Sequence, residues 1–396
     1  MKVVFISNFL NHHQLPLCLE LVKHLGDGYR FVQTEPVDQE RLRMGYREFA
    51  EAYDFLLCPY RSEEAMEATR RAVDEADFVI IGSAPNSYIE KRLKEKKPVI
   101  RYSERFLRTQ KWRYFTPKSL KFMLSNHTRY KNDPVYVLCA SAYTARDYAI
   151  FGAYKGKTYK WGYLPEVKHY DTDALMKKKR EGKLSLLWVA RFMKLKHPEK
   201  FLKCCARLKK DGVAFTANII GSGDEEAVMR AFVQKHHLTD DVHFCGFMPP
   251  EAVREEMEKA DIFMFNSDYR DGWGAVINEA MNSGCAVITS HAPGAGPFLI
   301  KHGENGLIYK NESFRDLYRC LRKVTDDAEY RTKMGKAAYQ TMAGVWNAEF
   351  AAERLVRLME ALQKGKSTPF ESGPCSPALP IPQRRMFKAV RKGETI

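Results

Sequence analysis

The chain of 396 residues contains no long apolar segment, which excludes a bundle of membrane-spanning helices. Its longest stretch without Asp, Glu, Lys or Arg, residues 280–300, is interrupted by Gly, Pro, Asn and Ser. The apolar run after Lys2 is too short for the core of a signal peptide. We therefore expect a cytoplasmic protein whose attachment to the inner face of the membrane, if any, is peripheral.

Cysteine chemistry is equally limited. The nine cysteines include no Cys-x-x-Cys pair and no Cys/His spacing typical of zinc sites. Their number is odd and most lie in apolar runs, so we interpret them as buried, reduced thiols. Hydrophobic residues at 45% and charged residues at 29% are ordinary for globular proteins, and the length suggests two or three domains.

Acidic residues are scarce in two parts of the chain, which carry most of its formal net charge of +15. Residues 101–183 hold 19 basic and 7 acidic side chains, and residues 364–396 hold 7 and 2, whereas residues 1–100 hold 14 and 16. A solvated face would explain any single cluster. Clustering on this scale favours an anionic partner, such as a membrane leaflet or a phosphate-bearing substrate.

Short apolar runs alternate with amphipathic or charged runs, the pattern of a parallel, doubly wound α/β sheet. In the first part of the chain, the apolar runs that we expect to be strands are 3–7, 78–82, 98–102 and 135–140, with helices at 15–25 and after Ser141. The alternation then starts again, with strands at 184–190, 214–221, 242–246, 262–266 and 286–290 and helices at 198–210, 250–259 and 276–283.

The two series predict two Rossmann-like domains that face a cleft, residues 1–168 and 184–345, joined by a polar linker at 169–183. Residues 346–363 predict an amphipathic helix that packs back on the N-terminal domain. The tail, 364–396, is rich in Pro, Ser and Gly and then basic, so we expect it to be mostly disordered. Three apolar residues of the tail would touch a membrane, although a plain solubilising tail fits equally well: Met386, Phe387 and Val390.

Two short motifs in the second domain lie at the ends of expected strands. One contains cations and the other contains glycines. Arg191 follows a buried strand and Lys196 lies five residues further on, so these cations suit a diphosphate, or are simply solvated surface charges. Gly221 and Gly223 end the next strand, where glycine lets the backbone approach a ligand closely, or merely forms a turn.

A third string is more specific: Asp271-Gly-Trp-Gly-Ala-Val-Ile-Asn-Glu279, followed by Ala-Met-Asn-Ser-Gly284. Glycines at a helix N-terminus expose N–H groups that favour an anion. A carboxylate within the same helix suits a pair of vicinal hydroxyls, as ribose offers. An acidic helix cap followed by a surface Glu is the alternative interpretation.

From residue 184 to residue 310 the sequence resembles the family 4 glycosyltransferases, which are retaining enzymes of the GT-B fold. Their hallmark is E-G-F-G-x-x-x-x-E-A-M-x-x-G, and this chain reads D-G-W-G-A-V-I-N-E-A-M-N-S-G. Further strings match in order and spacing: Arg191 with Lys196, Gly221 with Gly223, Gly246-Phe247-Met248, and Asn305-Gly306. The chain departs from the family at Asp271, which replaces the first Glu, and at Gly294-Ala-Gly-Pro-Phe298, which lacks a carboxylate.

The resemblance implies a role for each matching residue. Arg191 and Lys196 would hold the donor diphosphate, Glu279 would bind the ribose hydroxyls, and Asp271 would face the donor sugar. The shorter side chain of Asp271 leaves the identity of that sugar open. Other residues would line the bound nucleotide sugar: Gly221, Gly223, Phe247, Gly272, Trp273 and Gly274.

Retaining transfer passes through an oxocarbenium-like state in which the leaving diphosphate gains negative charge. Arg191 and Lys196 would stabilise that state more than the ground state. The departing phosphate oxygen would take the acceptor proton on the same face, so we expect no cofactor and no divalent metal. Asp171-Thr-Asp173 has the spelling of a metal site but lies in the expected linker.

In the first domain, the loop after the first strand contains Asn11, His12 and His13, and the resemblance places this loop on the acceptor side. Either histidine would donate to or deprotonate an acceptor hydroxyl, or would cap the following helix. Glu104, at the end of a later strand, is a further acceptor-side candidate, in a position where relatives often have His.

We therefore expect a metal-independent, retaining hexosyltransferase that moves a sugar from a nucleotide diphosphate-sugar to a polysaccharide or lipid-linked acceptor in cell-surface glycan synthesis. The alternatives are a nucleotide-sugar epimerase or glycan phosphorylase on the same architecture, and a basic protein that binds nucleic acid or membrane. The basic runs carry no recognition motif and do not alternate with aromatics, so no nucleic-acid partner is expected.

Overall fold

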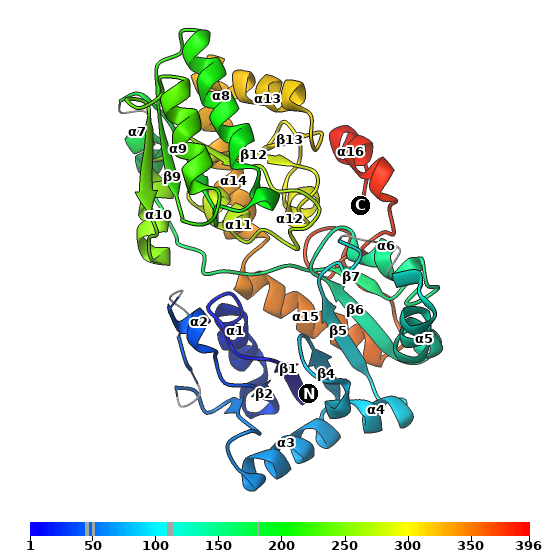
Figure 1. Ribbon diagram of the computed structural model, residues 1–396. Helices are drawn as coiled ribbons and strands as arrows, with labels where there is room; N and C mark the ends of the chain where they lie inside the picture. Colours follow the sequence, from blue (N-terminus) through cyan, green and yellow to red (C-terminus); the bar gives the residue numbers. More distant parts are fainter. Residues whose placement is uncertain (44–46, 50–51, 109–113, 180–181) are drawn as a thin grey trace. The chain divides into compact units, whose positions relative to one another are not determined.

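The computed structural model describes residues 1–43, 47–49, 52–108, 114–179 and 182–396. The chain divides into two compact α/β units, each built on its own parallel sheet (Figure 1). Unit 1 comprises Met1–Glu166 and Trp346–Pro382, and unit 2 comprises Val167–Val345 and Gln383–Ile396.

Unit 1 contains a seven-stranded sheet in the order β3-β2-β1-β4-β5-β6-β7, with every neighbouring pair parallel. The strands that were expected from apolar runs are confirmed to within one residue, because these runs are mostly buried, and β1 and β4 are buried along their whole length. The strands are β1 (Val3–Ser7), β2 (Tyr29–Gln33), β3 (Leu56–Leu57), β4 (Phe78–Ile81), β5 (Val99–Ser103), β6 (Val135–Cys139) and β7 (Thr158–Lys160).

The helices of unit 1 include one from near the C-terminus of the chain. The apolar face of α15 packs against α1 and contributes Leu355 and Leu358 to the core of this unit. The helices are α1 (Leu15–Leu25), α2 (Gln39–Arg43), α3 (Glu63–Glu75), α4 (Glu90–Lys94), α5 (Pro117–Asn126), α6 (Thr144–Ala149) and α15 (Ala348–Gln363).

Unit 2 contains a six-stranded sheet in the order β10-β9-β8-β11-β12-β13, again parallel throughout. Aromatic side chains such as Trp188 and Phe201 fill the core between this sheet and its helices. The strands are β8 (Leu184–Val189), β9 (Phe215–Ile220), β10 (Val242–Gly246), β11 (Ile262–Phe265), β12 (Ala286–Ser290) and β13 (Leu307–Tyr309).

The segment that was expected to be a linker, 169–183, is not separate from the two units, because its described residues lie within unit 2. Helix α7 packs against α10 and α14, and the buried ammonium of Lys179 donates to the carbonyls of Met257 and Ala260 at 2.8 and 2.5 Å. The helices of unit 2 are α7 (Thr172–Lys179), α8 (Pro198–Lys210), α9 (Glu226–Lys235), α10 (Pro250–Lys259), α11 (Val276–Asn282), α12 (Ala295–Leu299), α13 (Phe314–Asp326), α14 (Ala328–Gly344) and α16 (Gln383–Lys392).

The expectation of a mostly disordered tail is wrong. The backbone of Ser376 and Ala378 pairs with β7, at 2.8 and 2.9 Å, so the tail satisfies polar groups that an edge strand leaves open. The basic run that follows folds into α16, whose Met386 and Val390 are buried on unit 2 and are not available to a membrane. Composition alone does not reveal such docking.

None of the described helices combines the length and the apolar composition that a membrane crossing requires. The interpretation of the cysteines as reduced thiols agrees with the structure, in which all nine are free and eight are buried.

Candidate functional site

The order of strands in unit 2 reverses between β8 and β11, which are neighbours in the sheet. In open α/β sheets, ligands bind beyond the carboxyl ends of the strands at such a reversal. The loop after β8 carries Arg191 and Lys196, and the loop after β11 runs from Asn266 to Gly274. The sequence signals that lay far apart along the chain are thus brought to adjacent loops.

Lys196 and Asp271 connect these two loops. The ammonium Nζ lies 2.5 Å from Oδ2 of Asp271, and the two side chains are only 16% and 14% exposed. The same ammonium lies 5.0 Å from the ring centroid of Phe265. Shelter from water strengthens this pair relative to a surface salt bridge. A diphosphate that binds Lys196 would therefore either displace Asp271 from the ammonium or share the ammonium with it.

Arg191 differs from Lys196 because its side chain is exposed. No side chain in the described part of the molecule forms a hydrogen bond or ion pair with its guanidinium. It thus offers a planar set of donors to an anion without first breaking an internal contact.

The turn at Gly221 and Gly223 packs directly on the segment after Arg191. Their φ angles are +134° and +148°, and a Cβ on Gly221 would lie 2.0 Å from the carbonyl oxygen of Ala190. The N–H of Phe192 donates to the carbonyl of Ser222 at 2.8 Å. These glycines allow one loop to lie against the other, so they position the Arg191 segment whether or not a ligand also approaches them.

Two aromatic candidates lie in contrasting environments. The indole of Trp273 is 1% exposed and its Nε1–H donates to Oδ1 of Asn278 at 2.9 Å, so it anchors the turn of Gly272 and Gly274 in the core. Phe247 follows the edge strand β10 and is 60% exposed. In the sheet, β9 and β8 lie between β10 and β11, which precedes the Asp271 loop.

Glu279 lies on α11, where it is partly buried. Desolvation raises the pKa of this carboxyl to about 7, and the positive charge of Arg254 acts in the opposite direction. Near neutral pH the group therefore exists in both protonation states, so it can both accept from and donate to the hydroxyls of a ribose.

We predict that the Glu279→Gln variant is more stable than the wild type above pH 7 in the absence of nucleotide. The folded protein retains a proton on Glu279 that the unfolded chain loses near its ordinary pKa, so this group weakens folding progressively as the pH rises towards 7. The difference should approach about 3 kcal/mol. Thermal unfolding of both proteins between pH 4.5 and 8 measures it. Glu255→Gln, at an exposed position on α10, should show no such pH-dependent difference.

In unit 1 the strand order reverses between β1 and β4, and the loop after β1 holds Asn11, His12 and His13. The Asn11 side chain turns the chain into α1, since its Oδ1 accepts from the N–H of His13 at 3.0 Å and its amide donates to Gln14 at 3.1 Å. The rings of His12 and His13 lie 3.9 Å apart. Burial and then the neighbouring His12 lower the pKa of His13 to about 3.

His13 therefore has a neutral ring at physiological pH, and it lines a small hollow with Gln14, Tyr102 and Trp161. Its Nδ1 is buried and has no hydrogen-bond partner in the part of unit 1 that the structure describes. The carboxylate of Glu104, by contrast, already has two partners. One oxygen accepts from the hydroxyl of Tyr163 at 2.8 Å, and the other pairs with Arg108.

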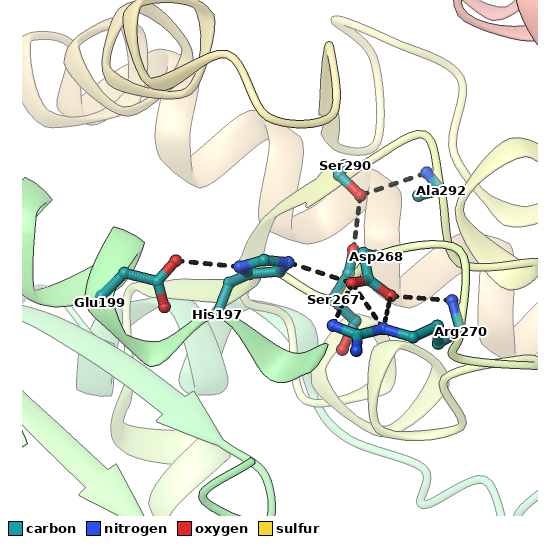
Figure 2. Close-up of polar contacts among 7 residues, drawn as sticks. All are labelled: His197, Glu199, Ser267, Asp268, Arg270, Ser290 and Ala292. Atoms are coloured by element: carbon teal, nitrogen blue, oxygen red, sulfur yellow. Dashed lines mark hydrogen bonds and ion pairs between the residues drawn. The ribbon is translucent and has the colours of Figure 1, made fainter. Parts of the chain in front are cut away.

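The structure also reveals residues that the sequence analysis missed. Figure 2 shows His197 between the carboxylates of Glu199 and Asp268, with Nδ1 and Nε2 at 2.9 and 3.2 Å, and Arg270 on the far side of Asp268. Ser290 joins β12 to the same loop by donating to the carbonyl of Ser267 at 2.8 Å. The one sequence feature that could have pointed to these residues is that His197 directly follows the candidate Lys196.

Among the described residues, neither Asp171 nor Asp173 lies in a group of three or more His, Cys, Asp or Glu side chains that could hold a metal ion. Oδ1 of Asp171 accepts from the backbone of Asp173 and Ala174 at the start of α7, and Asp173 pairs with Lys336 at 2.5 Å. Both carboxylates have a structural explanation.

The architecture matches solved structures along most of the chain. HepE of Anabaena, in complex with UDP, superposes with a TM-score of 0.66 at 15% identity, over 92% of this chain and 100% of that one. Sucrose-phosphate synthase from Thermosynechococcus elongatus gives 0.61 at 14% identity, over 92% and 100%. The fold is therefore GT-B, as the sequence analysis expected.

Residues 171–341 match the family model of the glycosyl transferases group 1. The match covers the larger part of unit 2 and includes Arg191, Lys196, Asp271 and Glu279. The amylovoran biosynthesis glycosyltransferase AmsK of Erwinia amylovora is 28% identical over 184 residues, and the putative colanic acid biosynthesis glycosyltransferase WcaL of Escherichia coli is 26% identical over 185. Each alignment covers 45% of this chain and 45% of the relative, so the chain matches about half the length of these proteins.

Proposed function

We propose that the protein is a retaining glycosyltransferase that transfers a hexose from a nucleotide diphosphate-sugar to a polysaccharide or lipid-linked acceptor in cell-surface glycan synthesis. The observation that carries the proposal is the meeting of Arg191, Lys196, Asp271 and the Gly272–Gly274 turn at the strand reversal of unit 2. The match of residues 171–341 to the glycosyl transferases group 1 supports it, as does the similarity to AmsK and WcaL, glycosyltransferases of amylovoran and colanic acid biosynthesis.

Each residue has a role that follows from its environment. Arg191, exposed and without an internal partner among the described residues, binds the donor diphosphate and stabilises the charge that grows on it. Lys196 provides a second, partly buried cation, and Asp271 holds it and faces the donor sugar. Glu279 binds the ribose. The bond from the sugar C1 to the diphosphate breaks, and the departing oxygen takes the proton of the attacking acceptor hydroxyl.

Unit 1 is the proposed acceptor side. His13, which has a neutral ring and a buried Nδ1, lies on the loop after β1, where the strand order of unit 1 reverses and a ligand is expected to bind. The basic stretch 101–183 supplies the charge for peripheral attachment to the anionic inner leaflet. Met386 and Val390 of the tail have no part in this attachment, since both are buried.

Thermal stabilisation by nucleotides tests the proposal. We expect one of UDP, GDP or ADP, or a corresponding sugar nucleotide, to raise the melting temperature, and EDTA to leave the shift unchanged. UDP and UDP-glucose come first, because HepE has been solved with each. A ligand at 100 times its Kd should add about 2.7 kcal/mol to the stability of the folded protein.

Three outcomes would contradict this proposal. No shift with any nucleotide would exclude the donor site and direct attention to binding of nucleic acid or membranes. A shift that EDTA abolishes would exclude the metal-free site. Conversion of the sugar nucleotide to an isomer without an acceptor would identify an epimerase instead.

A further inference from the structure

The backbone at His197 is in a conformation that histidine rarely adopts. Its φ and ψ are 50° and 53°, in the left-handed region, where a side chain is strained and glycine is favoured. The residue lies directly between Lys196 and Pro198, which begins α8. A non-glycine residue here indicates that its side chain compensates for the strain.

That side chain bridges two carboxylates. Nδ1 lies 2.9 Å from Oε1 of Glu199, and Nε2 lies 3.2 Å from Oδ2 of Asp268, with the imidazole 21% exposed (Figure 2). Both ring nitrogens face carboxylate oxygens, so the imidazole links the two side chains. Burial acts to raise the pKa of Glu199, but the hydrogen bond to His197, together with the charges of His197 and Lys200 and a backbone hydrogen bond, leaves the pKa below its usual value.

Asp268 is itself held from the other side. Both of its carboxylate oxygens accept from Arg270, with Nη2 at 2.7 Å from Oδ2. Its N–H donates to the carbonyl of Leu195 at 3.1 Å, and its carbonyl accepts from the N–H of Asp271 at 3.2 Å. The loop after β8 and the loop after β11 are therefore joined both by the backbone hydrogen bond between Asp268 and Leu195 and by the imidazole.

We propose that His197 is a positioning residue that sets Lys196 against Asp271 at the diphosphate of the donor. The inference rests on the proposed function and deepens it. His197 is adjacent to Lys196, and Asp268 lies three residues before Asp271, so the His197–Asp268 contact and the Lys196–Asp271 pair cross the same two loops. Fixing the first contact limits how far the ammonium of Lys196 can move.

The proposal predicts a selective defect. In His197→Gly, glycine tolerates the backbone angles but the bridge is lost, so Lys196 is no longer held in place. Affinity for the nucleoside diphosphate should fall about tenfold, whereas affinity for the monophosphate, which relies on the base and on Glu279, should stay within twofold. His197→Asn, which also tolerates this backbone but is too short to span both carboxylates, should behave in the same way.

Isothermal titration with UDP, GDP and ADP and their monophosphates measures both affinities. The matched control is His237→Gly, because His237 is also in the left-handed region, at φ 52°, but is exposed beyond α9. It should bind both ligands as the wild type does. Equal loss of mono- and diphosphate affinity, or no loss, in the two His197 variants would overturn the positioning role.

The wild-type titration separates this inference from the proposed function. If the wild type binds no nucleoside diphosphate, the proposed function fails, and the positioning role fails with it. If the wild type binds one and the ratio of the two affinities is unchanged in His197→Gly and His197→Asn, only the inference about His197 fails.

Discussion

Replacement of Arg191 by alanine is expected to lower kcat for sugar transfer by roughly 10²–10³-fold, the usual effect of removing one preorganised group that stabilises transition-state charge. The exposed guanidinium makes no ion pair with a described residue, so its removal leaves the fold intact. Initial rates with the donor found by the nucleotide screen, together with the melting temperature, measure both effects. Arg191→Lys should recover only part of the rate, because an ammonium lacks the planar pair of donors.

Lys194→Ala is the matched control, since Lys194 is an exposed cation of the same loop. It should change kcat by less than twofold, because loss of a general surface charge does not affect the leaving group. If both variants lose activity equally, the loop acts through its overall charge, and the specific role of Arg191 at the diphosphate is wrong.

Gly221→Ala is expected to be the most destabilising of these substitutions, with a loss of about 3 kcal/mol in the free energy of unfolding. The added Cβ would lie 2.0 Å from the carbonyl oxygen of Ala190, and φ of +134° is unfavourable for alanine. The contact cannot relax through a flexible side chain, since the obstacle is backbone. Thermal unfolding should show a decrease of roughly 6–12 °C in melting temperature.

Gly212→Ala separates the two causes. Gly212 has φ of +73° but open space around its Cβ position, so it should lose only about 1 kcal/mol through backbone strain. A similar loss in both variants would show that the close approach to Ala190 is unimportant. Gly221→Ala should also weaken nucleotide binding, because the displaced β8 loop carries Arg191 and Lys196.

Local signals predicted much of unit 2 to the residue. Helices α8 and α10 begin at the expected prolines and end at the expected lysines, and β10 and β12 have the expected bounds. These elements are apolar or amphipathic runs bounded by Pro and Gly, so their limits are written in the local sequence. Strands such as β3 and β7 were not predicted, because two or three residues give no periodic pattern.

The tail shows how local composition misleads. Pro, Ser, Gly and basic residues predicted disorder, yet Ser376 and Ala378 pair with β7 and Met386 is fully buried. The deciding factors are an edge strand with open backbone groups and an apolar surface on unit 2, both built from distant segments. Neither factor is visible in residues 364–396 themselves.

The sequence by itself determined the two α/β series, the resemblance of the second to a glycosyltransferase family, and the identities of Arg191, Lys196, Asp271 and Glu279 as candidates, since spacing along one chain is enough to show a motif. Only the tertiary structure decided how these residues are held. It paired Lys196 with Asp271, placed His197 between Glu199 and Asp268, and raised the pKa of Glu279 by burial. Those properties depend on which loops meet at the strand reversal of a folded sheet, and on how much water is excluded there.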